Sequence, residues 1–343
     1  MIYFYLIIYL FRIINITEPQ PEITITAAPD YIEYTRIINK AESSILNEKI
    51  GEAQHYYDEA FKLTKRPLTN HCYTSLQVSA MLKDPLHFKD LSGIAFRSGL
   101  KPEYLEKDSL LNSFIQEEHL YEYLEQTYLE NKDAYAAQID KFLYDTIGKI
   151  AIKDQKWKVY YLETMPKKHP EREKEYEQIY DSIVSHLVEE QLMPLIEQYG
   201  YPGERKLGSD PVGYVPNDAF RWAFVNNTAK LVLLHYYSRP KTERYNALLN
   251  KEVKKGNLVP EHYASIMDFQ AQYGSHKTGE EKFYNQWMYS KDSTQFEAIN
   301  RRRAEIGLPT FQEKEKKDER GHEKCAGLKQ GQYHYIKLFH WCG

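Results

Sequence analysis

The stretch GEAQHYYDEAFKLTKRP, residues 51–67, decides the fold that the sequence predicts. Ala53, Tyr57 and Ala60 lie three or four positions apart, which is the spacing of one face of an α-helix. Pro67 ends this pattern, because proline cannot continue a helix. The stretch therefore predicts a helix whose inner face carries two alanines and one tyrosine.

A second helix is predicted directly before this stretch. Asp30 can accept hydrogen bonds at the N-terminus of a helix that begins at Tyr31. One face of that helix is marked at helical spacing by Tyr34, Ile38, Ala41 and Ile45. The two helices together predict a helical hairpin.

The layout of this hairpin returns 35 residues later. Ala60-Phe61 recurs as Ala95-Phe96, Arg66-Pro67 recurs as Lys101-Pro102, and Ile38, Ala41 and Ile45 are matched by Tyr73, Leu76 and Ala80. A hairpin of about 34 residues with this pattern resembles the tetratricopeptide repeat. The second unit departs from that pattern, since Phe88 and Ser92 stand where alanine and an aromatic residue are expected. We predict tetratricopeptide-like repeats over residues 30–130, with the helix at 108–129 covering the open end of the stack.

The remaining sequence predicts longer helices and hardly any strands. Residues 131–313 form a predicted helical domain, in which the glycine- and proline-rich stretch 201–216 is a loop. Residues 314–343 are a predicted tail that opens as a charged, solvated or frayed helix and closes as an aromatic cluster. The fold class that follows is all-α.

Six short motifs in this second half occur in a recognisable order. They are KDQKW (153–157), EQYGYPGERKLG (197–208), LVLLHYY (231–237), KKGNLVPEHYASIMD (254–268), QYGS (272–275) and NRRRAEIGLPTF (300–311). In this order they resemble an uncharacterised bacterial family, domain of unknown function six-six-two-four. The resemblance covers about residues 140–311, and it implies the Bacteroidota-type architecture in which tetratricopeptide-like helices stand in front. It implies a fold and candidate positions, and no reaction.

The resemblance directs attention to His235 and Asp268, and the sequence departs from the family beside both. The family has an acid two residues after the histidine, where this chain has Tyr237, and an arginine after the aspartate, where this chain has Phe269. If the family has an acid-base site, this member is altered in it. Tyr273, Gly274 and Arg303 are further positions that the family motifs mark.

Charge and cysteine content narrow the classes of partner. The 45 basic and 49 acidic residues are mixed along the chain and give a net charge of -4, so no nucleic-acid partner is expected. Three cysteines do not make a disulfide framework in a chain of 343 residues. Oligomeric state is left open by the sequence.

The apolar N-terminal run MIYFYLIIYLF is too short for a stable membrane span. It is either a signal remnant, with residues 1–29 as signal and linker, or a segment that packs on the body of the protein. The first alternative places the protein in the cell envelope or periplasm, and the second in the cytoplasm.

Metal and cofactor motifs are weak. No two of His235, His262, Asp268 and His276 have the spacing of a helix-borne zinc pair. The tail pattern His322, Cys325, His340 and Cys342 offers four ligands of the right type, but its second pair is spaced too closely. The loop at 201–216 lacks a phosphate-binding glycine motif. We therefore expect neither a metal nor a cofactor.

Two functional hypotheses follow. The first is a non-enzymatic binding or scaffold protein, in which a concave surface lined by Tyr34, Tyr57 and Tyr73 holds a peptide or a protein partner. The second is a hydrolase that uses His235 as general base and Asp268 to orient it, with Tyr273 or Arg303 holding an anionic group. The loss of the family acid after His235 favours binding.

Overall fold

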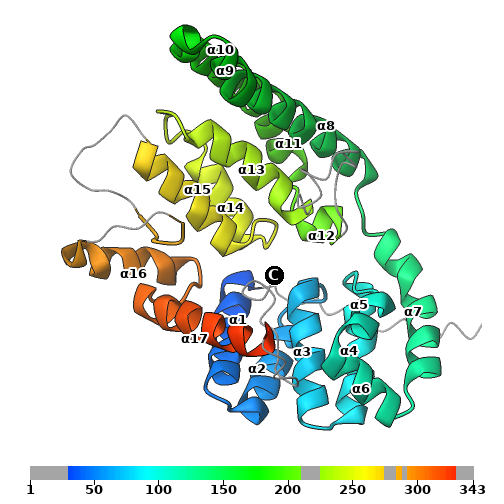
Figure 1. Cartoon of the computed structure of the whole chain (residues 1–343). Coiled ribbons are helices and arrows are strands. Elements are labelled where there is room, and N and C mark those ends of the chain that lie inside the picture. The colour runs from blue at the N-terminus through cyan, green and yellow to red at the C-terminus, as the bar shows by residue number, and fades with distance from the viewer. Residues whose placement is uncertain (1–29, 210–224, 274–282, 288–291, 330–343) are drawn as a thin grey trace, which may run out of the picture.

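Every regular element in the described part of the chain is helical, so the predicted all-α class is confirmed (Figure 1). The computed structural model describes residues 30–209, 225–273, 283–287 and 292–329. The α-helices are α1 (Tyr31–Leu46), α2 (Ile50–Lys62), α3 (Thr69–Met81), α4 (Pro85–Arg97), α5 (Pro102–Lys107), α6 (Ser109–Glu117), α7 (Tyr121–Ala136), α8 (Lys141–Lys158), α9 (Met165–Lys168), α10 (Glu173–His186), α11 (Met193–Tyr199), α12 (Glu204–Leu207), α13 (Val225–Tyr237), α14 (Asn246–Lys254), α15 (Pro260–Tyr273), α16 (Phe296–Glu305) and α17 (Phe311–Lys329). Two π-helical segments, η1 (Val159–Thr164) and η3 (Leu187–Leu192), and two 3-10 turns, η2 (Pro170–Arg172) and η5 (Ser293–Gln295), complete the order.

The N-terminal helices form hairpins, and the turns after α1, α3 and α6 have the same backbone conformation. Helix α1 packs on α2, α3 packs on α4, and α7 returns to pack on α4. The turn after α1, α3 and α6 each contains a non-glycine residue in the left-handed region, namely Glu48, Lys83 and His119. The next residue then donates its backbone N–H to a carbonyl five positions back, a hydrogen bond of the Schellman motif. The repeated turn lets each helix end sharply and the next one fold back.

The predicted binding tyrosines lie in the core and not on a concave surface. Tyr34, Tyr57 and Tyr73 are at most 8% exposed and belong to the apolar cluster that fills the stack. The Tyr34 hydroxyl is bonded to Nδ1 of His71 at 2.7 Å, and the Tyr73 hydroxyl donates to Asp108. The prediction that these rings line an open groove is therefore wrong, because helical spacing marks the buried face of a helix just as well as an exposed one.

A second apolar core is built from residues 143–308 and surrounds α13. Here two long helices each pass through a π-helical segment that ends two residues before a proline, Pro166 or Pro194. The residue preceding each proline donates its N–H to the carbonyl five positions back, from Met165 to Tyr160 and from Met193 to Val188. Proline clashes with the carbonyl four residues before it, and the wider turn relieves that clash without ending the helix.

The two cores are joined by buried polar contacts. Arg205 of α12 donates Nε to the Arg66 carbonyl at 2.8 Å and Nη1 to the Gly256 carbonyl at 2.5 Å, and its guanidinium lies over the ring of Tyr31. Its neighbour Glu204 accepts the backbone N–H of Thr69 at 2.6 Å. The stretch 201–216, predicted as loop, thus contains a short helix that holds α1 and α3.

Helix α17 also closes over α1, as Figure 1 shows at the lower left. Lys317 pairs with the buried Glu42, and Arg320 donates to the Leu46 carbonyl at 2.7 Å. The charged start of the tail was predicted to be solvated, but Lys314 and Lys317 are buried. The lysine charge at position 317 therefore holds α17 against α1.

Other predictions fall on residues that lie outside the described part. These are the N-terminal segment 1–29, Gly274, His276, His340, Cys342 and the side chain of Cys325. None of the described helices combines the length and the apolar character that a bilayer span requires.

Candidate functional site

His235 is held by a buried aspartate that sequence reasoning did not select. The ring lies near the C-terminal end of α13, and its Nδ1 is 2.7 Å from Oδ2 of Asp154 on α8. The His235 side chain is 18% exposed, whereas that of Asp154 is fully buried. The carboxylate therefore fixes the ring from inside the protein, while the histidine side chain stays partly exposed.

Asp154 is in turn held by two neighbours. The Tyr180 hydroxyl, from α10, donates to its Oδ1 at 2.7 Å, and Nε2 of Gln155 donates to its Oδ2 at 3.1 Å. Burial, and then the charge of Asp154, raise the pKa of Tyr180, so its hydroxyl stays protonated and donates. These donors provide the hydrogen bonds that a buried carboxylate requires.

The contact with Asp154 decides which nitrogen of His235 is available. When Nδ1 carries the proton given to the carboxylate, a neutral ring has Nε2 as a free acceptor. No residue in the described part forms a hydrogen bond with Nε2. The described residues also contain no group of three side chains able to hold a metal ion. The cluster of His235, Asp154 and Tyr180 is thus suited to accepting and returning a proton.

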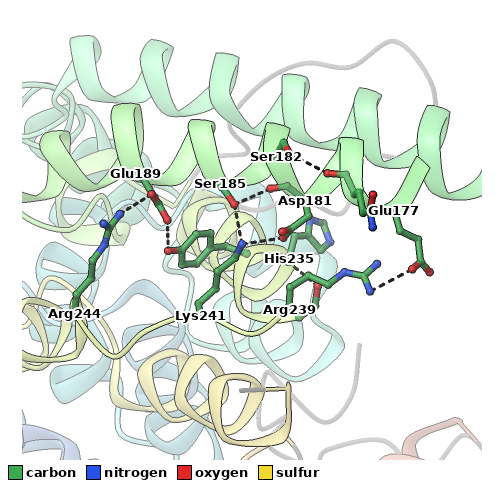
Figure 2. A network of polar contacts seen from close by, with 12 residues as sticks. Glu177, Asp181, Ser182, Ser185, Glu189, His235, Arg239, Lys241 and Arg244 are labelled. Atoms are coloured by element: carbon green, nitrogen blue, oxygen red, sulfur yellow. Dashed lines mark hydrogen bonds and ion pairs between the residues drawn. The ribbon is translucent and has the colours of Figure 1, made fainter. Parts of the chain in front are cut away.

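A network of charged groups beside this cluster fixes the segment after α13 (Figure 2). Acceptors recur every fourth residue along α10 and η3, at Glu177, Asp181, Ser185 and Glu189. They face cationic side chains: Arg239 pairs with Glu177 at 3.6 Å, Lys241 with Asp181 at 2.9 Å and Arg244 with Glu189 at 2.7 Å. Lys241 also donates to Ser185 at 2.8 Å, so it is held by two acceptors, and the three pairs fasten the segment along one side of α10.

Asp268 does not orient His235, which corrects the predicted pairing. Its carboxylate accepts the backbone N–H groups of Tyr284 and Gln286 at 2.6 Å and of Trp287 at 2.9 Å. Among the described residues its hydrogen bonds all go to this turn, and those of the His235 ring all go to Asp154. Asp268 therefore shapes the 284–287 turn.

Arg303 was predicted to hold an anionic group and is instead 1% exposed. It donates Nε to the Pro309 carbonyl at 2.6 Å and Nη1 to the Tyr284 carbonyl at 2.7 Å. It supports the same turn as Asp268 and is closed to solvent. Tyr273 is 40% exposed at the end of α15, where its ring packs on Phe269.

The structure brings together positions that local spacing cannot connect. Asp154 is 26 residues from Tyr180 and 81 from His235. The signal that could have found Asp154 was the Asp-Gln pair in the motif KDQKW, which had been used only for the family resemblance. His235 is thus the one predicted catalytic candidate that lies in a polar cluster with an outward edge.

A separate feature of the surface lies one turn along the same helix from Asp154. An open hollow of about 550 Å³ is lined by Lys156, Trp157, Val159, Tyr160, Tyr161 and Thr164. Trp157 stacks on Tyr161 with 5.6 Å between ring centroids, and Tyr160 stands edge-on to both. None of the six residues of η1 is fully buried: Tyr160 is exposed, whereas Tyr161 is partly covered by Tyr176 of α10.

The comparisons add no relative to this description: no family model, curated protein or solved structure matches the chain.

Proposed function

We propose that the chain is a binding or scaffold protein that holds an acidic segment of a partner protein on the aromatic hollow of α8 and η1. The relation to the domain of unknown function six-six-two-four is part of the proposal and rests on the order of the six motifs. The tetratricopeptide-like character of α1–α4 is likewise proposed. It is supported by the pairs at an offset of 35, of which Ala41 and Leu76, Ile45 and Ala80, and Ala60 and Ala95 are all buried.

The observation that carries the proposal is the exposure of the hollow. The inner faces first predicted to bind are filled by the packing of the N-terminal helices on one another, and α12 and α17 add further contacts with α1. In contrast, Tyr160 is 42% exposed, and Trp157 and Tyr161 are only partly buried. Rings in this state supply a large apolar contact at low cost in conformational entropy.

Charge next to the hollow selects the kind of partner. Lys149, Lys153 and Lys156 follow one another at spacings of four and three along α8, and all three are exposed. None of them forms an ion pair with a described residue. Lys156 itself lines the hollow and stands 5.3 Å over the ring of Trp157. An acidic segment with one aromatic or leucine side chain would match both the lysines and the rings.

The test uses fluorescein-labelled nonapeptides that place a central tryptophan or leucine between acidic residues. Anisotropy titrations should show saturable binding to the wild-type protein that weakens as salt rises. The double variant Lys156→Glu/Tyr160→Ala should bind at least tenfold more weakly, because both side chains are exposed and the core is untouched.

The matched control carries Lys254→Glu and Tyr104→Ala, which change one exposed lysine and one exposed tyrosine far from the hollow in the sequence. Its affinity should stay within about twofold of the wild-type value, as for surface changes outside an interface. Equal binding by the hollow variant and the control, or preference for peptides with lysine in place of the acids, would refute the proposal.

A further inference from the structure

We propose that His235 is a general base that activates water for the hydrolysis of an anionic carboxylic ester, with Asp154 as its positioning residue. The inference is independent of peptide binding at the hollow, because it uses the opposite nitrogen of a ring whose Nδ1 is already engaged. It replaces the His235 and Asp268 pair predicted from the sequence with a pair that is in contact.

The first step of the argument is the orientation of the ring. A general base needs one nitrogen directed outward and the other held by an acceptor that favours the protonated ring in the transition state. Asp154 is fully buried and lies 2.7 Å from Nδ1, and Tyr180 and Gln155 keep its carboxylate in place. The imidazolium that forms when Nε2 takes a proton is thus paired at once with a fixed charge.

The second step is that packing alone does not explain why polar side chains, those of His235, Asp154 and Tyr180, stand here in place of apolar ones. Val184, Leu187 and Val232 belong to the surrounding apolar core, and a buried polar cluster is often no more stabilising than apolar side chains of the same volume. A ring used only as a tie between α8 and α13 would have no need of an unpaired nitrogen. Nε2 has no hydrogen-bond partner among the described residues, and the His235 side chain is 18% exposed, so water can reach part of it.

Arg239 supplies the preference for an anion. It lies beside His235 in Figure 2, where it reaches Glu177 on α10, the helix that also carries Tyr180. It pairs with Glu177 at 3.6 Å, and both side chains are about a third or more exposed, which makes the pair weak. A carboxylate on the substrate can take the place of Glu177, whereas Lys241 is held by two partners.

The reaction balances with water as the only co-reactant. Nε2 of His235 removes a proton from water as the water oxygen bonds to the ester carbonyl carbon. The bond from that carbon to the alkoxy oxygen then breaks, and the imidazolium returns the proton to the leaving oxygen. The products are a carboxylic acid and an alcohol, and His235 is neutral again.

The experiment compares a neutral and an anionic chromogenic ester, 4-nitrophenyl acetate and the mono-4-nitrophenyl ester of glutaric acid. The variant His235→Asn keeps an amide N–H near the position of Nδ1 for Asp154 but cannot carry a proton between water and substrate. Its kcat/KM should fall about a hundredfold, while its unfolding midpoint stays close to that of the wild type. His186→Asn, which changes an exposed histidine on α10, is the matched control and should keep the wild-type rate.

Two further variants separate positioning from folding. Asp154→Asn should lower kcat with little change in KM, since it disturbs the orientation of the ring and not the binding of the ester. Arg239→Ala should raise KM for the glutarate ester more than for the acetate ester. Hydrolysis of both esters by His235→Asn at the wild-type rate would overturn the proposal, and so would a wild-type rate no higher than that of the variant.

Discussion

Two buried aspartates show how the same side chain serves different ends in this protein. The Asp154 carboxylate is hydrogen-bonded to Tyr180 of α10 and to His235 of α13, and the histidine side chain is partly exposed. Asp268 is satisfied by three backbone N–H groups and keeps a turn closed. A carboxylate bound by backbone groups is a structural cap, whereas one that holds a titratable ring can take part in chemistry.

Asp268 should make the stability of the fold depend on pH. Burial raises the pKa of Asp268 to about 6, although the N–H groups of the turn and the charge of Arg303 act against this rise. With an ordinary pKa near 3.9 in the unfolded chain, the contribution is fully present below about pH 4 and is lost as pH rises through about 6.

The measurement is urea denaturation of the wild type and of Asp268→Asn across this range. The free energy of unfolding of the wild type should fall relative to the variant by about 2 to 3 kcal/mol between the two ends of the window. A difference that does not vary with pH would contradict the assignment.

At the scale of elements, the caps at helix ends determine where neighbouring segments come into contact. Gly256 follows the C-terminal cap of helix α14 with a φ of 71°, and Asn257 donates its N–H to the Glu252 carbonyl five positions back. This is the Schellman motif, and the turn that it makes brings the Gly256 backbone against the ring of Tyr31. The cap of one helix is thus also a contact between the two cores.

Replacing Gly256 by alanine should therefore destabilise the protein more than a helix-end change alone. A Cβ at this position would lie 2.3 Å from a ring atom of Tyr31, and the left-handed φ is costly for any other residue. We expect a loss of about 2 to 3 kcal/mol in the free energy of unfolding. Gly51→Ala is the matched control, since nothing lies within 4 Å of its added Cβ. That change should stabilise α2 by about 0.5 kcal/mol, and equal effects at the two glycines would contradict this reading of the joint.

At the scale of the whole molecule, the second half of the chain occupies the surface that the first half would offer to a ligand. Arg205 reaches between α1 and α14, and α17 returns to cover α1 (Figure 1). These contacts bury surface of the N-terminal helices against the second half of the chain and so help to stabilise the stack.

The variant Arg205→Lys tests this joint. Lysine cannot reproduce the two bonds, to the carbonyls of Arg66 and Gly256, or the planar contact with Tyr31. The free energy of unfolding should drop by about 2 to 4 kcal/mol. Arg301→Lys, at an exposed ion pair with Glu297, should change it by less than about 0.5 kcal/mol. Unfolding in two separate steps would show that the joint is the weakest part of the molecule, and an unchanged midpoint would show that it contributes nothing.

The sequence allowed the helices to be predicted and left their partners undetermined. Helical spacing identified the inner face of α1 and α2 correctly, as the burial of Ala41, Ala53 and Ala60 confirms. The same spacing misplaced Tyr34 and Tyr57 on an open groove, because periodicity gives the face of a helix and not what covers it. Both rings are buried inside the helical stack itself, where the Tyr34 hydroxyl is bonded to His71 of α3, 37 residues away along the chain. No local spacing rule gives such a contact.

The candidate site shows the same limit. His235 was selected from the resemblance, but its partner was assigned to Asp268 by the order of motifs. The true contact joins α8 to α13 and depends on how α8, α10 and α13 pack on one another, which residue spacing does not encode. The sequence did not show that Asp154 is buried, and a buried aspartate needs hydrogen-bond donors such as Tyr180 and His235.

Each π-helical segment, before Pro166 and before Pro194, holds one more residue than the same length of α-helix would. A turn closed by a bond to the fifth residue contains one residue more than an α-turn, so each of these helices accommodates a one-residue insertion in place. Deleting one residue between Val159 and Thr164, together with Pro166→Ala, would restore a continuous α-helix and keep the residues beyond it in phase with α10. The wider turn of η1 thus sets the spacing of Tyr160 and Tyr161, two of the rings on the surface proposed to bind a partner.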